Sequence, residues 1–200
     1  TEINIFKDLY PYQKSAVNQA IQIVDEYNGV IIADVVGMGK TFVGLALLKY
    51  LQQEEGYSPL IICPPALKDM GEIHLETYEI EAVVVSSGRL SSSAESDFFI
   101  NDFKKQGRDL VLIDESHNFR NENSLRFENL DMFMKKAVFG GKYRKAILLT
   151  ATPLANQYKD IRNQIQLFQP HYPDTNIPPA NLTDLDSYFK SISRKGEEEE

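Results

Sequence analysis

Two glycines, a lysine and a threonine follow a short apolar run, and residues of these types in this order can bind phosphate. The apolar run, 29–33, has the length and β-branching of a buried strand, and the run 42–51 after it predicts an amphipathic helix. Backbone N–H groups in such a turn, with the positive end of the helix dipole, favour an anion. The loop residues expected around the phosphate are Asp34, Gly37, Met38, Gly39, Lys40 and Thr41.

Several side chains of this loop have their own chemical reason to be there. Gly37 and Gly39 permit backbone dihedral angles and a close approach that a Cβ atom would prevent. Lys40 would reach the β- and γ-phosphates of a nucleotide, and the Thr41 hydroxyl would complete the shell of a Mg²⁺ ion. The first glycine of the usual phosphate-loop pattern is Asp34 here. For this stretch alone, an ordinary strand, turn and helix with a capping lysine is therefore the alternative.

Two adjacent carboxylates come directly after another apolar strand, 110–113. Asp114 and Glu115 are expected at the carboxyl edge of a sheet, where ligands bind in open α/β folds. Asp114 can hold the Mg²⁺ that Thr41 also contacts, and Glu115 can polarise a water that attacks the γ-phosphate. The alternative is that the acids cap the next segment. The upstream loop that carries Lys40 favours the catalytic interpretation over this alternative. We expect no zinc site at His117, because no other cysteine or histidine clusters with it.

A further strand, 145–149, delivers two threonines to the same predicted edge. The hydroxyls of Thr150 and Thr152 can hydrogen-bond to His117 or to the two acids. Strand ends without a special role seldom show this string after such an acid pair, so these threonines are candidate site residues.

Gln13 lies near the start of a helix that Pro11 predicts, upstream of the phosphate loop. Its amide offers both a donor and an acceptor, which is what the edge of an adenine requires. Most glutamines on helix surfaces do nothing specific, and an ordinary surface glutamine is the alternative here.

Apolar strands alternate with helices along most of the chain. We expect strands at 29–33, 60–63, 82–85, 110–113 and 145–149. This alternation predicts a three-layer α/β domain with a mostly parallel central sheet covered on both faces. From residue 170 onward prolines and polar residues predominate, which predicts that one domain covers 1–169 and that 170–200 is a linker or tail.

Composition narrows the classes of protein. The 200 residues are 42% hydrophobic and 25% charged, as is ordinary for a globular domain, and no run approaches the roughly 20 apolar residues that span a bilayer. A net charge of −8 argues against broad nucleic-acid affinity. The single cysteine, Cys63, favours a reducing intracellular setting. A basic cluster is interpreted as a solvated face; its members are Lys135, Lys136, Lys142, Arg144 and Lys145.

Taken together, the motifs resemble motifs I, II and III of superfamily 2 helicases, and they are most similar to the Swi/Snf-like branch of double-stranded DNA translocases. The three stretches are Asp34-Val-Val-Gly-Met-Gly-Lys-Thr41, Asp114-Glu-Ser-His117 and Leu149-Thr-Ala-Thr-Pro153. That branch carries aspartate where Asp34 stands. Residues 10–13 are similar to its Q-motif region and 61–65 to its motif Ia, so that the resemblance covers about 9–170.

The resemblance implies a RecA-like P-loop NTPase domain, the first motor lobe, that binds ATP and Mg²⁺. Lys40, Glu115 and His117 would serve catalysis, and Thr41 and Asp114 would hold the metal. Thr150 and Thr152, together with His117, would couple hydrolysis to movement on double-stranded DNA. Nucleic-acid contacts are implied, through phosphates rather than bases, at Pro64, Pro65, Lys68, Ser86 and Ser87.

The resemblance further implies that the full-length protein is a DNA-dependent ATP hydrolase. Such motors close ATP between two RecA-like lobes of one polypeptide, so we expect this segment alone to hydrolyse ATP weakly or not at all. One alternative is an RNA-directed or strand-separating superfamily 2 helicase, and another is a nucleotide-binding interaction module without motor activity. The sequence leaves the oligomeric state open.

Overall fold

The computed structural model describes residues 4–33, 39–92, 101, 103, 106–138, 141–151 and 158–198, and for Met70 and 194–198 only the backbone. Its strands are β1 (Gly29–Ala33), β2 (Pro59–Cys63), β3 (Val83–Ser86), β4 (Leu110–Ile113) and β5 (Lys145–Thr150). Its α-helices are α1 (Ile5–Asp8), α2 (Pro11–Tyr27), α3 (Lys40–Glu55), α4 (Lys68–Thr77), α6 (Leu125–Lys135), α7 (Tyr158–Gln166) and α8 (Leu185–Glu198). Short 3₁₀ turns are η1 (Pro65–Leu67), η2 (Ser87–Ser91), η3 (Ser116–Phe119) and η5 (Ala180–Leu182).

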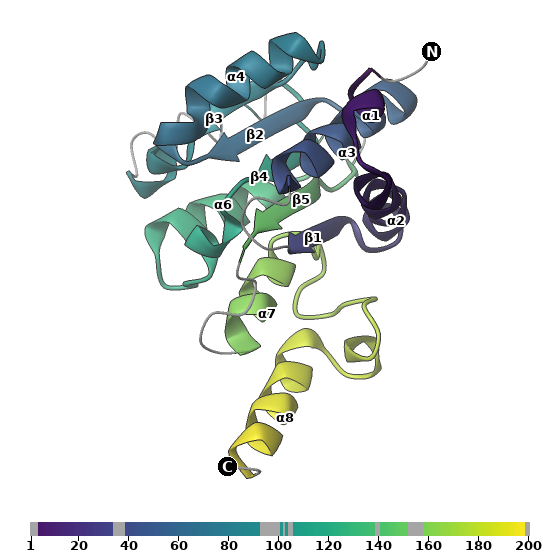
Figure 1. Ribbon diagram of the computed structural model, residues 1–200. Helices are drawn as coiled ribbons and strands as arrows, with labels where there is room; N and C mark the ends of the chain where they lie inside the picture. Colours follow the sequence, from purple (N-terminus) through teal and green to yellow (C-terminus); the bar gives the residue numbers. More distant parts are fainter. Residues whose placement is uncertain are drawn as a thin grey trace.

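The five strands form one sheet in the order β1-β5-β4-β2-β3, and every neighbouring pair is parallel. Successive side chains of β4 enter opposite cores, because side chains alternate across a sheet. Leu112 packs with residues of α2, α3 and α4, whereas Val111 and Ile113 pack with residues of α6. Figure 1 shows the helices on both faces of the sheet. The predicted three-layer α/β domain is confirmed.

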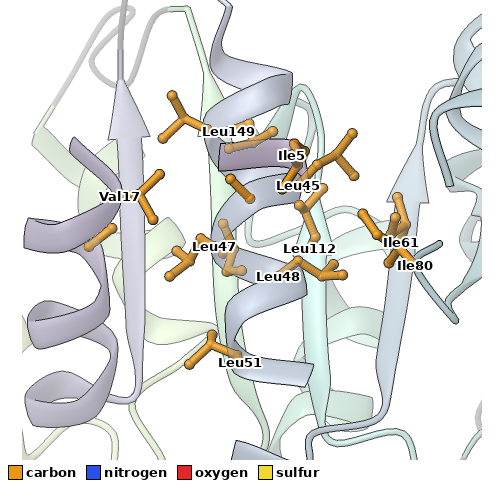
Figure 2. Close-up of a cluster of buried hydrophobic side chains, with 14 of the residues drawn as sticks. Ile5, Val17, Leu45, Leu47, Leu48, Leu51, Ile61, Ile80, Leu112 and Leu149 are labelled. Atoms are coloured by element: carbon orange, nitrogen blue, oxygen red, sulfur yellow. The ribbon is translucent and has the colours of Figure 1, made fainter. Parts of the chain in front are cut away.

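Helix α3 lies between the sheet and the two N-terminal helices, which explains the unbroken run of buried apolar residues from Val43 to Leu48. Figure 2 shows Leu45, Leu47, Leu48 and Leu51 of α3 among side chains from the strands and from α1 and α2. At Gly44 the helix approaches the sheet so closely that a Cβ atom would lie 2.9 Å from a methyl carbon of Leu149. The start of α3 is therefore held firmly against the strands that carry the other motifs.

Parallel pairing places the carboxyl ends of all five strands at one edge of the sheet. Along this edge the chain leaves β1 toward the phosphate loop, and Thr150 ends β5. Asp114 follows β4, Pro64 follows β2, and Ser87 follows β3. The fold thus aligns the predicted nucleotide residues on one half of the edge and the predicted nucleic-acid residues on the other.

Two members of the basic cluster, Arg144 and Lys145, do not lie on a solvated face, which corrects the sequence interpretation for them, whereas Lys142 is exposed. Arg144 is 1% exposed, and its guanidinium donates to the carbonyls of Arg108 and Phe133, each at 2.8 Å. The Lys145 ammonium lies 2.5 Å from a carboxylate oxygen of Asp25. Sequence proximity grouped these cations, but the fold gives Arg144 and Lys145 different partners.

The segment after residue 169 contains helix α8, which its prolines and polar residues did not predict. The segment contacts the domain near its start, where the Gln169 amide donates to the Tyr27 carbonyl at 2.9 Å and the Asn176 amide donates to the Glu26 carbonyl at 2.7 Å. Asp186 of α8 accepts from Arg162 of α7 at 3.1 Å. Figure 1 shows α8 beyond α7, on the side away from the sheet.

Candidate functional site

The phosphate loop and the predicted adenine-binding glutamine are in direct contact. Gly39 precedes α3 with a φ of 79°, and a Cβ atom built on it would lie 2.4 Å from Nε2 of Gln13. Gln13 is only 5% exposed, and its Oε1 accepts from the Tyr10 backbone N–H at 2.9 Å. The left-handed backbone therefore favours glycine at position 39, and a Cβ atom there would displace the amide of Gln13.

The start of α3 and the acid pair line one cavity of about 360 Å³. Gly39, Lys40 and Thr41 contribute one wall, and Asp114 and Glu115 follow β4 on another. The remaining lining comes from apolar side chains of α3, β2 and β4 and from η1 and α4, including Phe42, Leu45, Ile61, Leu67 and His74. The sequence prediction that these two motifs share a site is consistent with this geometry, and Asp34, Gly37 and Met38 lie outside the described residues.

Asp114 is placed by the sheet and shaped electrostatically by its neighbours. Its backbone N–H donates to the Ile62 carbonyl at 2.9 Å, so it continues the β2–β4 ladder. Burial raises the pKa of the Asp114 carboxyl, and the negative charge of Glu115 raises it further. A hydrogen bond from the Glu115 N–H and the charges of Lys40 and His117 oppose that shift in pKa. A cation beside Asp114 would favour its ionised form for the same reason.

Glu115 adopts the left-handed backbone conformation, with φ 51° and ψ 49°. A non-glycine residue holds this conformation only where its surroundings enforce it. The Glu115 carbonyl accepts from both the backbone N–H and the side-chain amide of Asn118, each at 3.0 Å. The strain is consistent with a residue whose direction matters to function.

His117 lies beside Glu115 at the start of η3. Its Nδ1 is 3.1 Å from Oε2 of Glu115, close enough for an ion pair when the imidazole is protonated. Nδ1 is buried and makes no aligned hydrogen bond among the described residues. The structure therefore places His117 against the acid pair, and its predicted part in coupling stays a prediction.

Thr150 is fully buried at the end of β5 and pairs in register with Ala33 of β1. It lies between the strand that leads to the phosphate loop and the strand that leads to Asp114. Thr152 lies outside the described residues, so its predicted contact with His117 stays a prediction.

The predicted nucleic-acid residues follow β2 and β3. Cys63 and Ser86 pair in register, so the residues after them are neighbours at the sheet edge. Pro65 is exposed and Lys68 is half exposed. The Lys68 ammonium lies 3.5 Å from Oε1 of Glu72. Ser86 accepts from the Gly88 N–H at 3.2 Å, whereas Ser87 is only 5% exposed. The hydroxyl of Ser87 consequently offers little surface to a phosphate.

Sequence reasoning missed the polar contact between α7 and the turn after the acid pair. The Ser116 hydroxyl donates to Oε1 of Gln164 at 2.7 Å, and both residues are completely buried. Because 48 positions separate them in the chain, only the fold brings them together. A glutamine in the buried position of a helical pattern was the one available signal.

The residues fit a magnesium–nucleotide complex better than a metal held by protein alone. Among the residues that the structure describes, no group of three or more His, Cys, Asp or Glu side chains could hold a metal ion. Thr41 and Asp114 offer two oxygen ligands in one cavity. Magnesium commonly takes one or two protein oxygens and completes its shell with phosphates and water. No helix within the described ranges is long and apolar enough to cross a membrane.

Comparison with known proteins agrees with this geometry. The family model described as "Type III restriction enzyme, res subunit" matches residues 6–68. The chain is 26% identical over 203 residues to Helicase SWR1 of Eremothecium gossypii, covering 90% of this chain and 13% of the relative. It is 30% identical over 164 residues to the uncharacterized ATP-dependent helicase YqhH of Bacillus subtilis, covering 76% of this chain and 28% of the relative.

A solved structure shares the fold. The SWI2/SNF2 ATPase core of Sulfolobus solfataricus in complex with dsDNA matches with a TM-score of 0.64 and 18% sequence identity. The match covers 94% of this chain and 43% of that chain. This chain thus spans less than half of the solved core and less than a third of either curated relative.

Proposed function

Because this chain is a RecA-like motor domain of the Swi/Snf-like branch of superfamily 2, we propose that it is the ATP-binding half of an ATP-dependent double-stranded DNA translocase. The observation that carries the proposal is the shared cavity of Lys40, Thr41, Asp114 and Glu115. A cation, a hydroxyl and two carboxylates in one cavity are the groups that phosphoryl transfer requires.

The nucleotide is assigned to the phosphate loop before α3 and to Gln13 on helix α2. Lys40 would neutralise the β- and γ-phosphates, and the backbone of Gly39 allows their close approach. Gln13, fixed against Gly39, would contact the adenine. Asp34, Gly37 and Met38 complete the assignment from sequence alone.

Mg²⁺ is assigned to the Thr41 hydroxyl and the Asp114 carboxylate. When bound, Mg²⁺ neutralises charge on the phosphate oxygens. The raised pKa of Asp114 supports the assignment, since burial of this carboxylate beside Glu115 is unfavourable until a cation compensates it.

Hydrolysis needs a group that orients water, and Glu115 is assigned that role. Its carboxylate is 38% exposed and borders the cavity, so it can accept a hydrogen bond from a water aimed at the γ-phosphate. Nδ1 of His117 lies 3.1 Å from Oε2 of Glu115, so a protonated imidazole can form an ion pair with that carboxylate. Thr150 and Thr152 would transmit the change in the site toward the rest of the sheet edge.

Duplex DNA is assigned to the other half of that edge. Pro64, Pro65 and Lys68 lie after β2, and Ser86 ends β3. Ser87, which begins η2, is left out of the assignment because it is only 5% exposed. The support is their position beside the nucleotide motifs and the fold shared with the Sulfolobus solfataricus core, which was solved in complex with dsDNA. Phosphate contacts of this kind position a duplex and do not read its bases.

The remaining assignments concern the whole protein. We assign 1–169 to the first motor lobe and 170–200 to a connection toward a second RecA-like lobe of the same polypeptide. The second lobe would close over the nucleotide. An intracellular location follows from the proposed substrates, ATP and DNA.

The test is the ATP hydrolysis rate of the full-length protein with duplex DNA, single-stranded DNA or RNA. We expect duplex DNA to raise kcat most. Stimulation by RNA or single strands alone would favour a strand-separating or RNA-directed motor. Nucleotide binding without turnover under any condition would leave a binding module without motor activity.

A further inference from the structure

Helix α7 holds the turn after the acid pair through three consecutive side chains. The contacts join Gln164 to Ser116, Asn163 to Arg120 and Arg162 to Glu122. Asn163 is completely buried, and its amide donates to the Arg120 carbonyl at 2.6 Å. The partners of α7 in these contacts, Ser116, Arg120 and Glu122, extend from the first residue of η3 into the loop after it. Helix α7 therefore fixes the segment that comes directly after Glu115.

The contact nearest to Glu115 is a buried polar pair. Ser116 Oγ donates to Gln164 Oε1 at 2.7 Å, and Gln164 Nε2 donates to the Asp160 carbonyl at 3.2 Å. Burial of an amide and a hydroxyl is unfavourable unless both are hydrogen-bonded. Because each partner satisfies the other, the pair specifies one position of Ser116 relative to α7.

That position bears on the backbone of Glu115. Its left-handed conformation is not one that glutamate prefers, so it needs anchors on both sides. Asp114 provides the first, because its Oδ1 accepts from the Glu115 N–H at 2.9 Å. Asn118 binds the Glu115 carbonyl, and the next residue, Ser116, is tied to Gln164.

We propose that Gln164 is a positioning residue for Glu115, acting through Ser116. Its side chain does not line the nucleotide cavity. It fixes the turn from which the Glu115 carboxylate reaches the cavity, and it thereby links the helix after β5 to the acid pair. The expected effect of Gln164 on the rate of ATP hydrolysis rests on the proposed function.

The test compares three variants of the full-length protein. Gln164→Met removes the acceptor at nearly constant side-chain size. The double variant Ser116→Ala with Gln164→Met removes both polar partners and leaves neither orphaned, so that folding is preserved. Gln166→Met is the matched control, because Gln166 lies on the same helix but donates to Asp131 of α6 at 3.3 Å rather than to the turn.

Two quantities are measured: hydrogen exchange of the peptide 115–120 and the kcat and KM of ATP hydrolysis with duplex DNA. We expect Gln164→Met and the double variant to speed exchange in this peptide. We also expect kcat to fall by about 10-fold at a KM within about twofold of wild type, because a misplaced catalytic group slows chemistry more than binding. Gln166→Met should leave both quantities unchanged.

Wild-type exchange and wild-type kcat in folded Gln164→Met would overturn the inference, as would equal changes in Gln166→Met. If the wild-type protein hydrolyses no ATP, the proposed function fails, and exchange in 115–120 alone then decides whether Gln164 holds the turn. Selective acceleration in the Gln164 variants would uphold the positioning role, and unchanged exchange would refute it.

Discussion

The side-chain amide of Gln13 occupies the space that a Cβ atom at Gly39 would need, with Nε2 only 2.4 Å from the ideal Cβ position. Residues of two separate motifs, a helix start and a phosphate loop, are thus fitted to one another. Gln13 is additionally fixed by the Tyr10 N–H. This contact holds Gln13, the side chain that we propose contacts the adenine, beside the phosphate loop.

Gly39→Ala is expected to weaken binding of a fluorescent ADP analogue by at least about 10-fold, because the new methyl displaces Gln13 and strains the loop. The matched control is Gly56→Ala at the other end of α3, where φ is 76° but no atom lies within 4 Å of the added Cβ. The control should lose stability, by about 1 kcal/mol, and retain nucleotide affinity.

A second comparison separates the two causes at position 39. Adding Gln13→Ala to Gly39→Ala relieves the collision but not the positive φ. Because Gln13 is itself proposed to contact the nucleotide, the reference is the single variant Gln13→Ala, and the double variant should bind nucleotide more weakly than this reference. Equal affinity of the double variant and Gln13→Ala would show that the backbone conformation of Gly39 is unimportant.

Asp114→Asn should stabilise the protein without metal at neutral pH, because it removes a buried carboxylate whose pKa is raised mainly by burial. A carboxyl with a raised folded pKa binds more protons in the folded state, so its ionisation lowers stability as pH rises through the folded pKa. The free energy of unfolding, measured by urea denaturation, should therefore rise less on Asp114→Asn as the pH falls below that pKa. An equal gain at all pH values would contradict this explanation. Mg²⁺-dependent hydrolysis should be lost.

Arg144→Met should lower the free energy of unfolding by about 3 kcal/mol, because buried carbonyls lose a charged donor. Burial lowers the pKa of the Arg144 guanidinium to about 10, and the ring of Phe133 lies 4.0 Å from its central carbon. Urea denaturation measures the effect. Arg126→Met is the control, because this partly exposed guanidinium donates to the Ser91 hydroxyl at 3.1 Å rather than to buried carbonyls. A loss of equal size there would contradict the role of burial.

The Cys63 thiol should resist alkylation in the folded protein. Burial raises its pKa to about 11, so about one thiol in a thousand is ionised at pH 8, against roughly a quarter at an ordinary pKa near 8.5. Mass spectrometry of the Cys63 peptide after iodoacetamide treatment should show slow labelling that urea accelerates. Rapid labelling of folded protein at pH 8 would mean that this part of the cavity is open.

The order of the motifs could be predicted from sequence because their signals are local. A strand, a glycine turn and a helix start are adjacent in the chain, and Asp114 directly follows its strand. Parallel pairing then places these strand ends at one edge without further information.

Contacts between distant positions could not be predicted in this way. Ser116 and Gln164 meet only after α7 packs on η3. Arg144 is buried where two chain segments, the residues before β4 and the end of α6, supply three carbonyls around it. Helix α8 was missed because prolines nearby dominate the local pattern, although the helix itself begins after them. Each of these features depends on where another element lies.

The measurement that tests the central claim most directly is ATP turnover by full-length Glu115→Gln with duplex DNA, beside its affinity for ATP. We predict that turnover falls at least about 100-fold while ATP affinity stays within about threefold, because the amide keeps the shape but orients water poorly. Glu76→Gln, an exposed exchange of the same type on α4, should behave as wild type. Undiminished DNA-stimulated turnover in Glu115→Gln would contradict the assignment of Glu115 as the residue that orients the attacking water.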